Sequence, residues 1–251
     1  MDEKQLPLTE HLTELRNRIA WILLAWVAGS LAAWSFSEEI FGFLLRPATA
    51  ALGPDGGSLQ AIAPTEIFFT YLKCAILAGF VLSLPITFWH IWGFIAPGLY
   101  QSERRLALPF VLASTLLFAG GAIFGYTFVF PLVFEFFAGF SSSFVEAAWT
   151  MKEVFSLTTR LFLAFGVGFE LPVVVFFLAA SGIVDPRTLL GGLKYGVLIA
   201  FVLGALLTPP DIVSQVLLAG PLTVLYVVGV CVGWLFAPKK KQAEGEQAEG
   251  A

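Results

Sequence analysis

Residues 161–179 read LFLAFGVGFELPVVVFFLA, an apolar run with one acidic side chain, Glu170, near its middle. A helix needs about 20 apolar residues to cross the hydrocarbon core of a bilayer, and this run has that length. Pro172 lacks the N–H that would bond to the Gly168 carbonyl, so the helix is weakened beside the acid. A charge at the middle of the bilayer costs at least about 2.5 kcal/mol. Two interpretations are open: a protonated acid hydrogen-bonded to another span, or a polar docking point that faces a groove.

The rest of the chain has the composition of a membrane protein. Of its 251 residues, 58 % are hydrophobic and 13 % are charged, whereas a soluble domain has roughly 25 % charged residues. Cys74 and Cys231 both lie in apolar runs and match no metal-ligand spacing. We therefore expect neither a disulfide framework nor a metal site.

Six apolar segments are predicted to form membrane-spanning helices. They cover residues 19–36, 67–95, 106–130, 157–180, 195–207 and 213–236. The fifth segment would extend only about 20 Å as a helix, which is too short to cross a flat bilayer. Because backbone polar groups must be satisfied internally in lipid, the segments predict an all-α polytopic membrane protein. We expect residues 1–18 to form a cytoplasmic amphipathic segment, residues 19–236 one transmembrane domain and residues 237–251 a disordered cytoplasmic tail.

The placement of the basic residues predicts the orientation. Six spans put both termini on one side of the membrane, and the loops on that side hold most of the Lys and Arg residues. These are Lys4, Arg16, Arg18, Arg104, Arg105, Arg187, Lys194, Lys239, Lys240 and Lys241, against Arg46 and Lys152 in the opposite loops. By the positive-inside rule, both termini are predicted to be cytoplasmic. The lysines of the tail are expected to lie at the lipid surface.

Two carboxylates are candidates for a cytoplasmic binding site. The segment HLTELRNR at residues 11–18 is predicted to be helical, because apolar residues recur there every three or four positions. Its Glu14 either pairs with Arg18 on the helix surface, worth at most about 0.5 kcal/mol, or is presented together with Glu10 to a basic ligand. Glu103 either sits favourably in the first turn of the third span or belongs to the same acidic patch.

The segment LLTPPDIVSQ, residues 206–215, joins the fifth and sixth spans. Pro209 and Pro210 predict a sharp turn, and Asp211 and Ser214 can cap the helix that follows. The sequence contains neither HExxH nor GxSxG, and no glycine-rich loop with a following lysine. We therefore predict no enzymatic reaction, no metal and no nucleotide cofactor.

Together these segments resemble the TatC family, the multispanning receptor subunits of the twin-arginine protein translocase. The resemblance rests on HLTELRNR, FIAPGLYQSERRLALPF, FGYTFVFPL, AFGVGFELPVV and LLTPPDIVSQ, which follow one another between Leu8 and Phe236. It implies a prokaryotic inner-membrane protein with a concave groove, in which the last two helices are short. One position departs from the family, since Val227 stands where members often have an acid.

The resemblance also implies a function. Proteins of this family bind signal peptides that carry two consecutive arginines and belong to folded cargo proteins, and export is driven by the proton motive force. Carboxylates can bind guanidinium groups in a bidentate manner, and lysine is a poor substitute. The implied binding residues are Glu14, Glu103, Arg16, Arg18, Phe94, Pro97 and Leu99.

The same resemblance implies that Glu170, beside Pro172, docks single-span partners of the TatA and TatB type. It further implies a homo-oligomer within the receptor complex and no nucleic-acid partner. An alternative function is a secondary transporter that uses Glu170 as a proton or cation site. The sequence shows no inverted repeat, which argues against that alternative.

Overall fold

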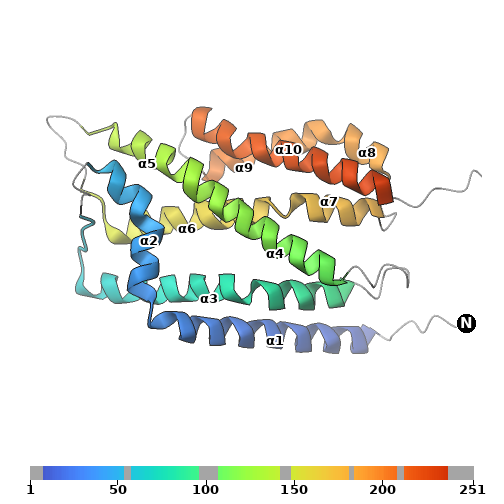
Figure 1. Ribbon diagram of the computed structural model, residues 1–251, viewed down its shortest axis with the longest axis horizontal. Helices are drawn as coiled ribbons and strands as arrows, with labels where there is room; N and C mark the ends of the chain where they lie inside the picture. The colour runs from blue at the N-terminus through green and yellow to red at the C-terminus, as the bar shows by residue number, and fades with distance from the viewer. Residues whose placement is uncertain are drawn as a thin grey trace, which may run out of the picture.

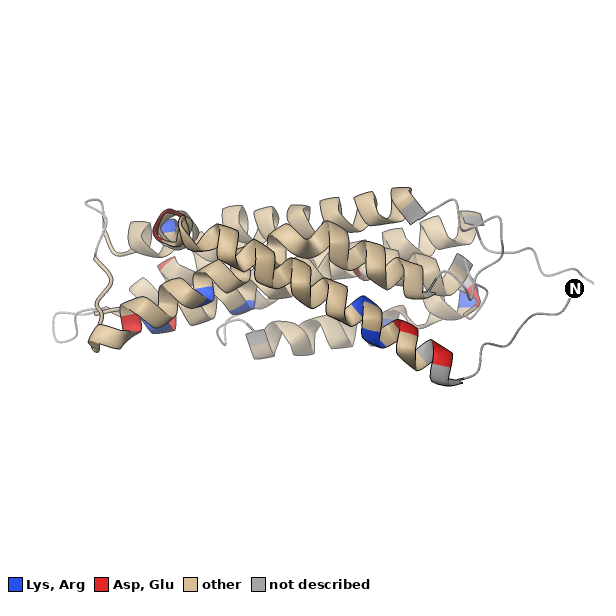
Figure 2. Ribbon diagram, turned by 90° about the horizontal axis from the view of Figure 1, so that it is seen from below, with Lys and Arg blue, Asp and Glu red and all other residues tan. Residues whose placement is uncertain are grey.

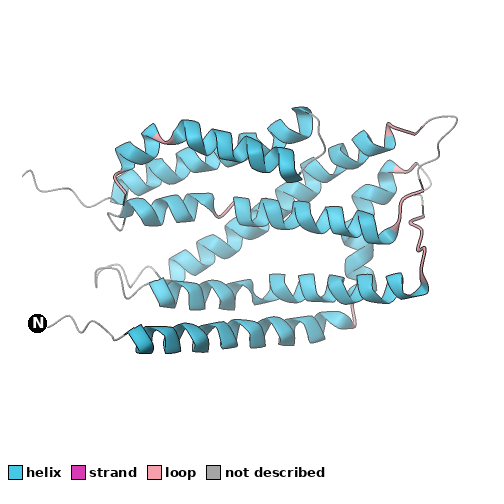
Figure 3. Ribbon diagram, turned by 180° about the vertical axis from the view of Figure 1, so that it is seen from behind, coloured by secondary structure: helices cyan, strands magenta, loops and turns pink. Residues whose placement is uncertain are grey.

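The structure is a computed structural model that describes residues 8–53, 58–95, 107–141, 148–180, 184–207 and 212–236. The helices are α1 (Leu8–Trp34), α2 (Ser37–Ala51), α3 (Pro64–Ile95), α4 (Ala107–Phe124), the π-helical turn η3 (Gly125–Val129), α5 (Phe130–Ala138), α6 (Met151–Gly168), α7 (Leu171–Ala180), α8 (Pro186–Gly191), α9 (Leu193–Leu207) and α10 (Ile212–Phe236). Apart from one isolated bridge between Gln60 and Thr150, the described residues form only helices and loops (Figure 3). The predicted all-α class is confirmed.

Five helical segments of the described chain are long and apolar enough to cross a membrane. They are Leu12–Trp34, Pro64–Phe94, Leu108–Ala138, Met151–Ala179 and Gln215–Leu235, and a shorter apolar helix covers Leu193–Leu206. The predicted polytopic architecture is thus confirmed, including the short fifth helix. The expectation that the last helix is also short is wrong, because α10 has 25 residues. Pro221 lies inside α10 without ending it, so the apolar run remains one helix.

The helices lie side by side in a bundle (Figure 1). Helix α1 packs almost entirely on α3, and α10 packs on α7 and α9. Helices α4 and α5 cross the others diagonally, while α2 stands steeply at one end, packed on α3 and α5 (Figure 1). Leu8 and Phe236 lie at the opposite end, which we call the amino-terminal end, and we call the other end the α2 end. Most of the charged residues lie toward these two ends (Figure 2), whereas Glu170 lies between α6 and α7 in the middle of the bundle.

The best-buried part of the protein lies where α2, α5, α6 and α10 meet. Leu45, Phe130, Phe134, Phe165 and Leu218 are almost completely buried there. In contrast, only 6 % of the apolar window Leu12–Trp34 is buried inside the protein. Helix α1 therefore depends on its contact with α3 and otherwise faces lipid, which solvates its apolar side chains as well as a protein core would.

The apolar segment 161–179 does not form one continuous helix, and it is interrupted at the predicted place beside Glu170. Helix α6 ends at Gly168 and α7 begins at Leu171, so Phe169 and Glu170 form a turn between two collinear helices. Glu170 accepts backbone hydrogen bonds from Val173 and Val174 at 3.0 and 3.1 Å, which start the second helix. The weakening expected from Pro172 is confirmed and amounts to a complete break in the helix.

Candidate functional site

At the amino-terminal end, one carboxylate is held by a cation of its own helix. The Nε of Arg18 donates to Oε1 of Glu14 at 2.9 Å, and Nη2 donates to the same oxygen. The third guanidinium nitrogen, Nη1, donates to the carbonyl of His90 on α3 at 3.4 Å. Glu14 and Arg18 are both partly exposed. The surface pair suggested by their spacing of four residues is therefore formed, and it also ties α1 to α3.

A glycine on α3 makes room for this contact. A Cβ atom at Gly93 would overlap the Arg18 guanidinium, so a larger residue would push the arginine away from His90. Sequence reasoning missed both His90 and Gly93. No local signal identifies them, because they become neighbours of Arg18 only through the packing of α1 on α3.

Arg16 lies on a different face of α1. Its Nη2 donates to the side-chain oxygen of Asn17 at 3.5 Å, and the side chain is exposed. Two residues along a helix rotate the direction of a side chain by roughly 200°, so Arg16 and Arg18 cannot serve the same carboxylate. Phe94 is half-buried near the end of α3. The remaining residues predicted for this site lie outside the described residues: Pro97, Leu99 and Glu103.

The turn between α6 and α7 places Glu170 between two neighbouring helices. The carboxyl group is half-buried, and Ser114 of α4 approaches it as a hydrogen-bonding group. Its Oε1 is buried and has no hydrogen-bond partner among the described residues. On the other side, Gly168 and Pro172 lie close to α10. The acid is thus neither sealed in the bundle nor fully exposed, and its role as a docking point stays a prediction.

The predicted turn before α10 cannot be followed in detail. Pro209, Pro210 and Asp211 lie outside the described residues, and Ser214 belongs to the first turn of α10. Sequence reasoning missed a neighbour, Gln215, which donates from Nε2 to the carbonyl of Phe201 at 3.0 Å. This bond joins α9 to α10 next to the turn.

The α2 end is closed by an acid to which no role was assigned from the sequence. Oε2 of Glu66 accepts the backbone N–H of Ile62 at 3.0 Å, and Oε1 accepts that of Lys152 at 2.9 Å. The bridge between Gln60 and Thr150 lies beside them. These bonds connect the segment before α3 to the start of α6. Glu66 stands one residue before the predicted segment 67–95, whereas in the structure it lies in the first turn of α3.

In the described part of the chain, no group of three or more His, Cys, Asp or Glu side chains is arranged to hold a metal ion. Cys74 is a buried free thiol and Cys231 is an exposed one. The described polar groups can instead accept guanidinium donors at α1 and present one acid at the break between α6 and α7. These are properties of a binding surface.

Comparisons with known proteins agree with this arrangement. The family model for the Sec-independent protein translocase protein (TatC) matches residues 10–221. The chain is 42 % identical to the TatC of Desulforapulum autotrophicum over 250 residues, which is 100 % of this chain and 92 % of the relative. It is 44 % identical to the TatC of Magnetococcus marinus over 249 residues, with 99 % and 91 % covered.

Solved structures give the same answer. The crystal structure of the twin arginine translocase receptor TatC superposes with a TM-score of 0.77 and 35 % identity, covering 90 % of this chain and 99 % of that one. A second crystal structure, of the receptor in DDM, gives a TM-score of 0.78 at the same identity and covers 89 % and 99 %. The family description is that of a translocase component and not of an enzyme or a small-solute transporter. The chain therefore belongs to the TatC family and is a multi-pass membrane component of Sec-independent protein translocation.

Proposed function

We propose that the amino-terminal end of α1 and α3 binds the paired arginines of twin-arginine signal peptides on folded cargo proteins. The observation that supports this proposal is the state of Glu14. Arg18 donates only to Oε1 of Glu14, so Oε2 of Glu14 can accept a hydrogen bond from a guanidinium group of a ligand. The bond from Arg18 to the His90 carbonyl holds the acceptor in place, which lowers the entropy lost when the ligand binds. Glu103 supplies the second carboxylate in this proposal.

The orientation belongs to the same proposal. The described cations divide evenly between the ends of the helices that contain them. Four belong to the amino-terminal end (Arg16, Arg18, Arg187, Lys194) and four to the half nearer the α2 end (Arg46, Lys73, Lys152, Arg160). This even distribution does not orient the protein. The excess of basic residues comes from Lys4, Arg104, Arg105 and the lysines of the tail, and by the positive-inside rule it supports a cytoplasmic amino-terminal end in a prokaryotic cell.

We also propose that Glu170 receives a single-span partner of the TatA or TatB type. A buried carboxyl oxygen without a partner is costly, and a polar side chain of an incoming helix would satisfy it. Crosslinking from position 170 to the partner in native membranes tests this step, and crosslinks at Val174 that are as strong as those at Glu170 would contradict a specific docking point.

The peptide site is tested by binding of a fluorescent twin-arginine peptide to the purified chain. Glu14→Gln keeps the size of the side chain but removes a charged hydrogen bond, so the dissociation constant should rise roughly tenfold to hundredfold. Glu103→Gln should act in the same direction. The control is Glu39→Gln, which removes an exposed acid in the first turn of α2 at the other end of the bundle.

A peptide with two lysines in place of the arginines should bind the wild-type chain more weakly, because lysine cannot form the bidentate contact. The proposal fails if Glu14→Gln and Glu39→Gln bind alike and both peptides bind equally well. Crosslinking from position 103 to the peptide adds a direct measure of proximity.

A further inference from the structure

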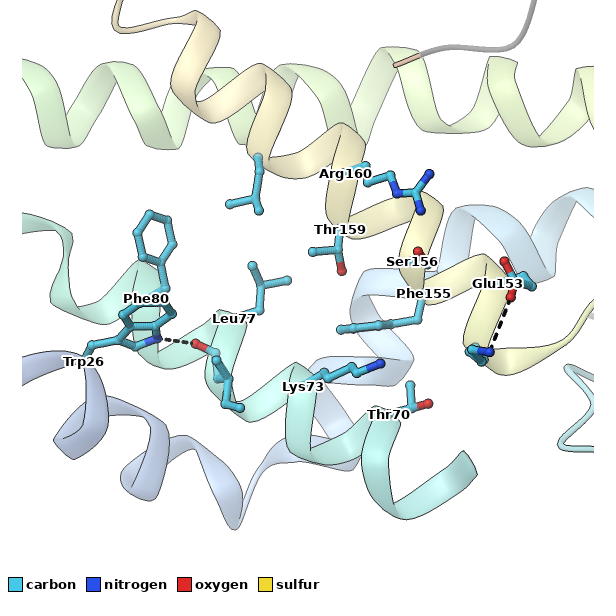
Figure 4. Close-up of a pocket in the computed structure, with 13 residues that line it drawn as sticks. Trp26, Thr70, Lys73, Leu77, Phe80, Glu153, Phe155, Ser156, Thr159 and Arg160 are labelled. Atoms are coloured by element: carbon cyan, nitrogen blue, oxygen red, sulfur yellow. Dashed lines mark hydrogen bonds and ion pairs between the residues drawn. The ribbon is translucent and has the colours of Figure 1, made fainter. Parts of the chain in front are cut away.

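A groove of about 530 Å³ opens between α1, α3 and α6, toward the α2 end of the bundle (Figure 4). It contains none of the residues assigned above to peptide or partner binding. Lys73 enters it from α3, and Thr159 and Arg160 line it from α6. Figure 4 shows Lys73 across the groove from Thr159, whereas Arg160 directs its guanidinium group away from Lys73.

The two cations lie at the same depth on facing helices. Lys73 follows the first residue of α3 by nine positions, and Arg160 follows the first residue of α6 by nine positions. At 1.5 Å per residue, each lies about 14 Å from the α2 end of its helix. Helix α3 would extend about 48 Å, slightly more than a whole bilayer with its headgroups. The cations therefore lie a few Å below the headgroup level, and their long side chains can reach the lipid phosphates.

Neither cation is neutralised within the described part of the protein. The ion pairs found there are Arg18 with Glu14 and Lys152 with Glu153, so no described carboxylate lies within 4.0 Å of Lys73 or Arg160. Thr159 adds an unused donor, because its Oγ1 is buried and without a hydrogen-bond partner. Cations inside a membrane span are costly unless an anion or water accompanies them. The groove thus gathers two cations without a carboxylate partner among the described residues, beside the paired Lys152 and Glu153 that also line it.

Below the cations the groove becomes apolar. Leu77 and Phe80 line it from α3, and Leu163 lines it from α6, each deeper in the bilayer than Lys73 or Arg160. Trp26 of α1 already donates its indole N–H to the Ile76 carbonyl at 2.8 Å, so its ring contributes apolar surface. A polar rim above an apolar floor matches the two halves of a phospholipid.

We propose that this groove holds one anionic phospholipid of the leaflet at the α2 end. The phosphate lies at the polar rim beside Lys73, with Arg160 on the facing helix, and one acyl chain lies over the apolar floor. A phosphate supplies the anion that Lys73 and Arg160 lack, whereas an apolar transmembrane helix would leave both cations without one. This proposal is independent of signal-peptide binding and holds or fails separately.

Native mass spectrometry of the full chain tests it by counting the lipids that remain bound after transfer from detergent. The probes are phosphatidylglycerol and phosphatidylcholine with identical acyl chains. The fraction of the wild-type chain that keeps one bound lipid should be at least tenfold higher with phosphatidylglycerol than with phosphatidylcholine. The double variant K73Q/R160Q should lose this preference. The control R187Q/K194Q removes the same charge from exposed positions at the amino-terminal end and should keep it.

Thermal unfolding provides a second readout that does not depend on survival in the gas phase. Phosphatidylglycerol should raise the unfolding midpoint of the wild-type chain and of the control above the value in phosphatidylcholine, and it should leave K73Q/R160Q unchanged. Equal retention and equal midpoints for the two double variants would overturn the proposal. Displacement of the lipid by glycerol phosphate, which lacks acyl chains, would also overturn it, as would displacement by the transmembrane peptide of a single-span partner.

Discussion

Replacing Gly79 by alanine should separate the first helix from the bundle. Gly79 on α3 faces Gly29 and Ser30 on α1, where the two backbones are in contact. A Cβ atom at Gly79 would lie 2.6 Å from the Cα of Ser30, whereas carbon atoms pack at about 3.5–4.0 Å. The obstacle is backbone and not the end of a flexible side chain, so α1 must move away by about 1 Å.

That movement would weaken the bonds that join the helices. The indole N–H of Trp26 donates to the Ile76 carbonyl at 2.8 Å, and the Arg18 guanidinium reaches the His90 carbonyl at 3.4 Å. An additional 1 Å takes both beyond hydrogen-bonding distance. Overpacking costs typically 1–3 kcal/mol, and each lost bond between membrane helices about 0.6 kcal/mol. We expect Gly79→Ala to lower the free energy of unfolding by about 2–4 kcal/mol.

The assay is thermal unfolding in detergent, followed by tryptophan fluorescence, together with the affinity for the twin-arginine peptide. At about 2–4 °C per kcal/mol for a chain of this size, the midpoint should fall by roughly 4–16 °C. Gly120→Ala on α4 is the matched control, because a Cβ atom there meets nothing within 4 Å. If Gly79→Ala unfolds at the same temperature as Gly120→Ala, the inferred contact between α1 and α3 is wrong. If it unfolds earlier but binds the peptide with unchanged affinity, the Arg18–His90 bond does not position the peptide site.

Two further substitutions test individual bonds, the first by proteolysis and the second by the same unfolding assay. Glu66→Gln leaves one acceptor oxygen for two backbone N–H groups, so the α2 end should be cleaved faster by an added protease than in Glu39→Gln. The Tyr226 hydroxyl donates to the Leu189 carbonyl at 2.6 Å and so joins α10 to α8. Tyr226→Phe removes this bond and should lower the free energy of unfolding by about 0.6–1.5 kcal/mol. Tyr195→Phe, whose hydroxyl belongs to a side chain that is 60 % exposed, should have almost no effect. Equal midpoints for the two tyrosine variants would contradict a stabilising role for the Tyr226 bond.

Features that depend on local sequence were predictable. Membrane spans follow from apolar length, because the thickness of the bilayer sets the number of residues required. The pair of Glu14 and Arg18 follows from a spacing of four residues on a helix, and the break at Glu170 follows from Pro172. The family could be recognised from short motifs, because the order and spacing of these motifs can be read from the sequence alone and do not depend on how the helices pack.

One expectation failed for an identifiable reason. The resemblance suggested that the last two helices are both short, yet α10 continues through Pro221 for 25 residues. A proline inside a membrane helix is tolerated because neighbouring groups can satisfy the freed carbonyl. The presence of Pro221 therefore does not predict the length of the helix that contains it.

The sequence by itself determined the class of the protein, the positions of its spans and the acid at the break. Only the tertiary structure decided that α1 packs on α3, that His90 and Gly93 support Arg18, and that Lys73 and Arg160 line one groove. The physical reason is that lipid and the protein interior are equally apolar. Residues that face lipid and residues that face another helix then look alike in the sequence, and the partners of each helix are selected by close packing and hydrogen bonds between distant positions.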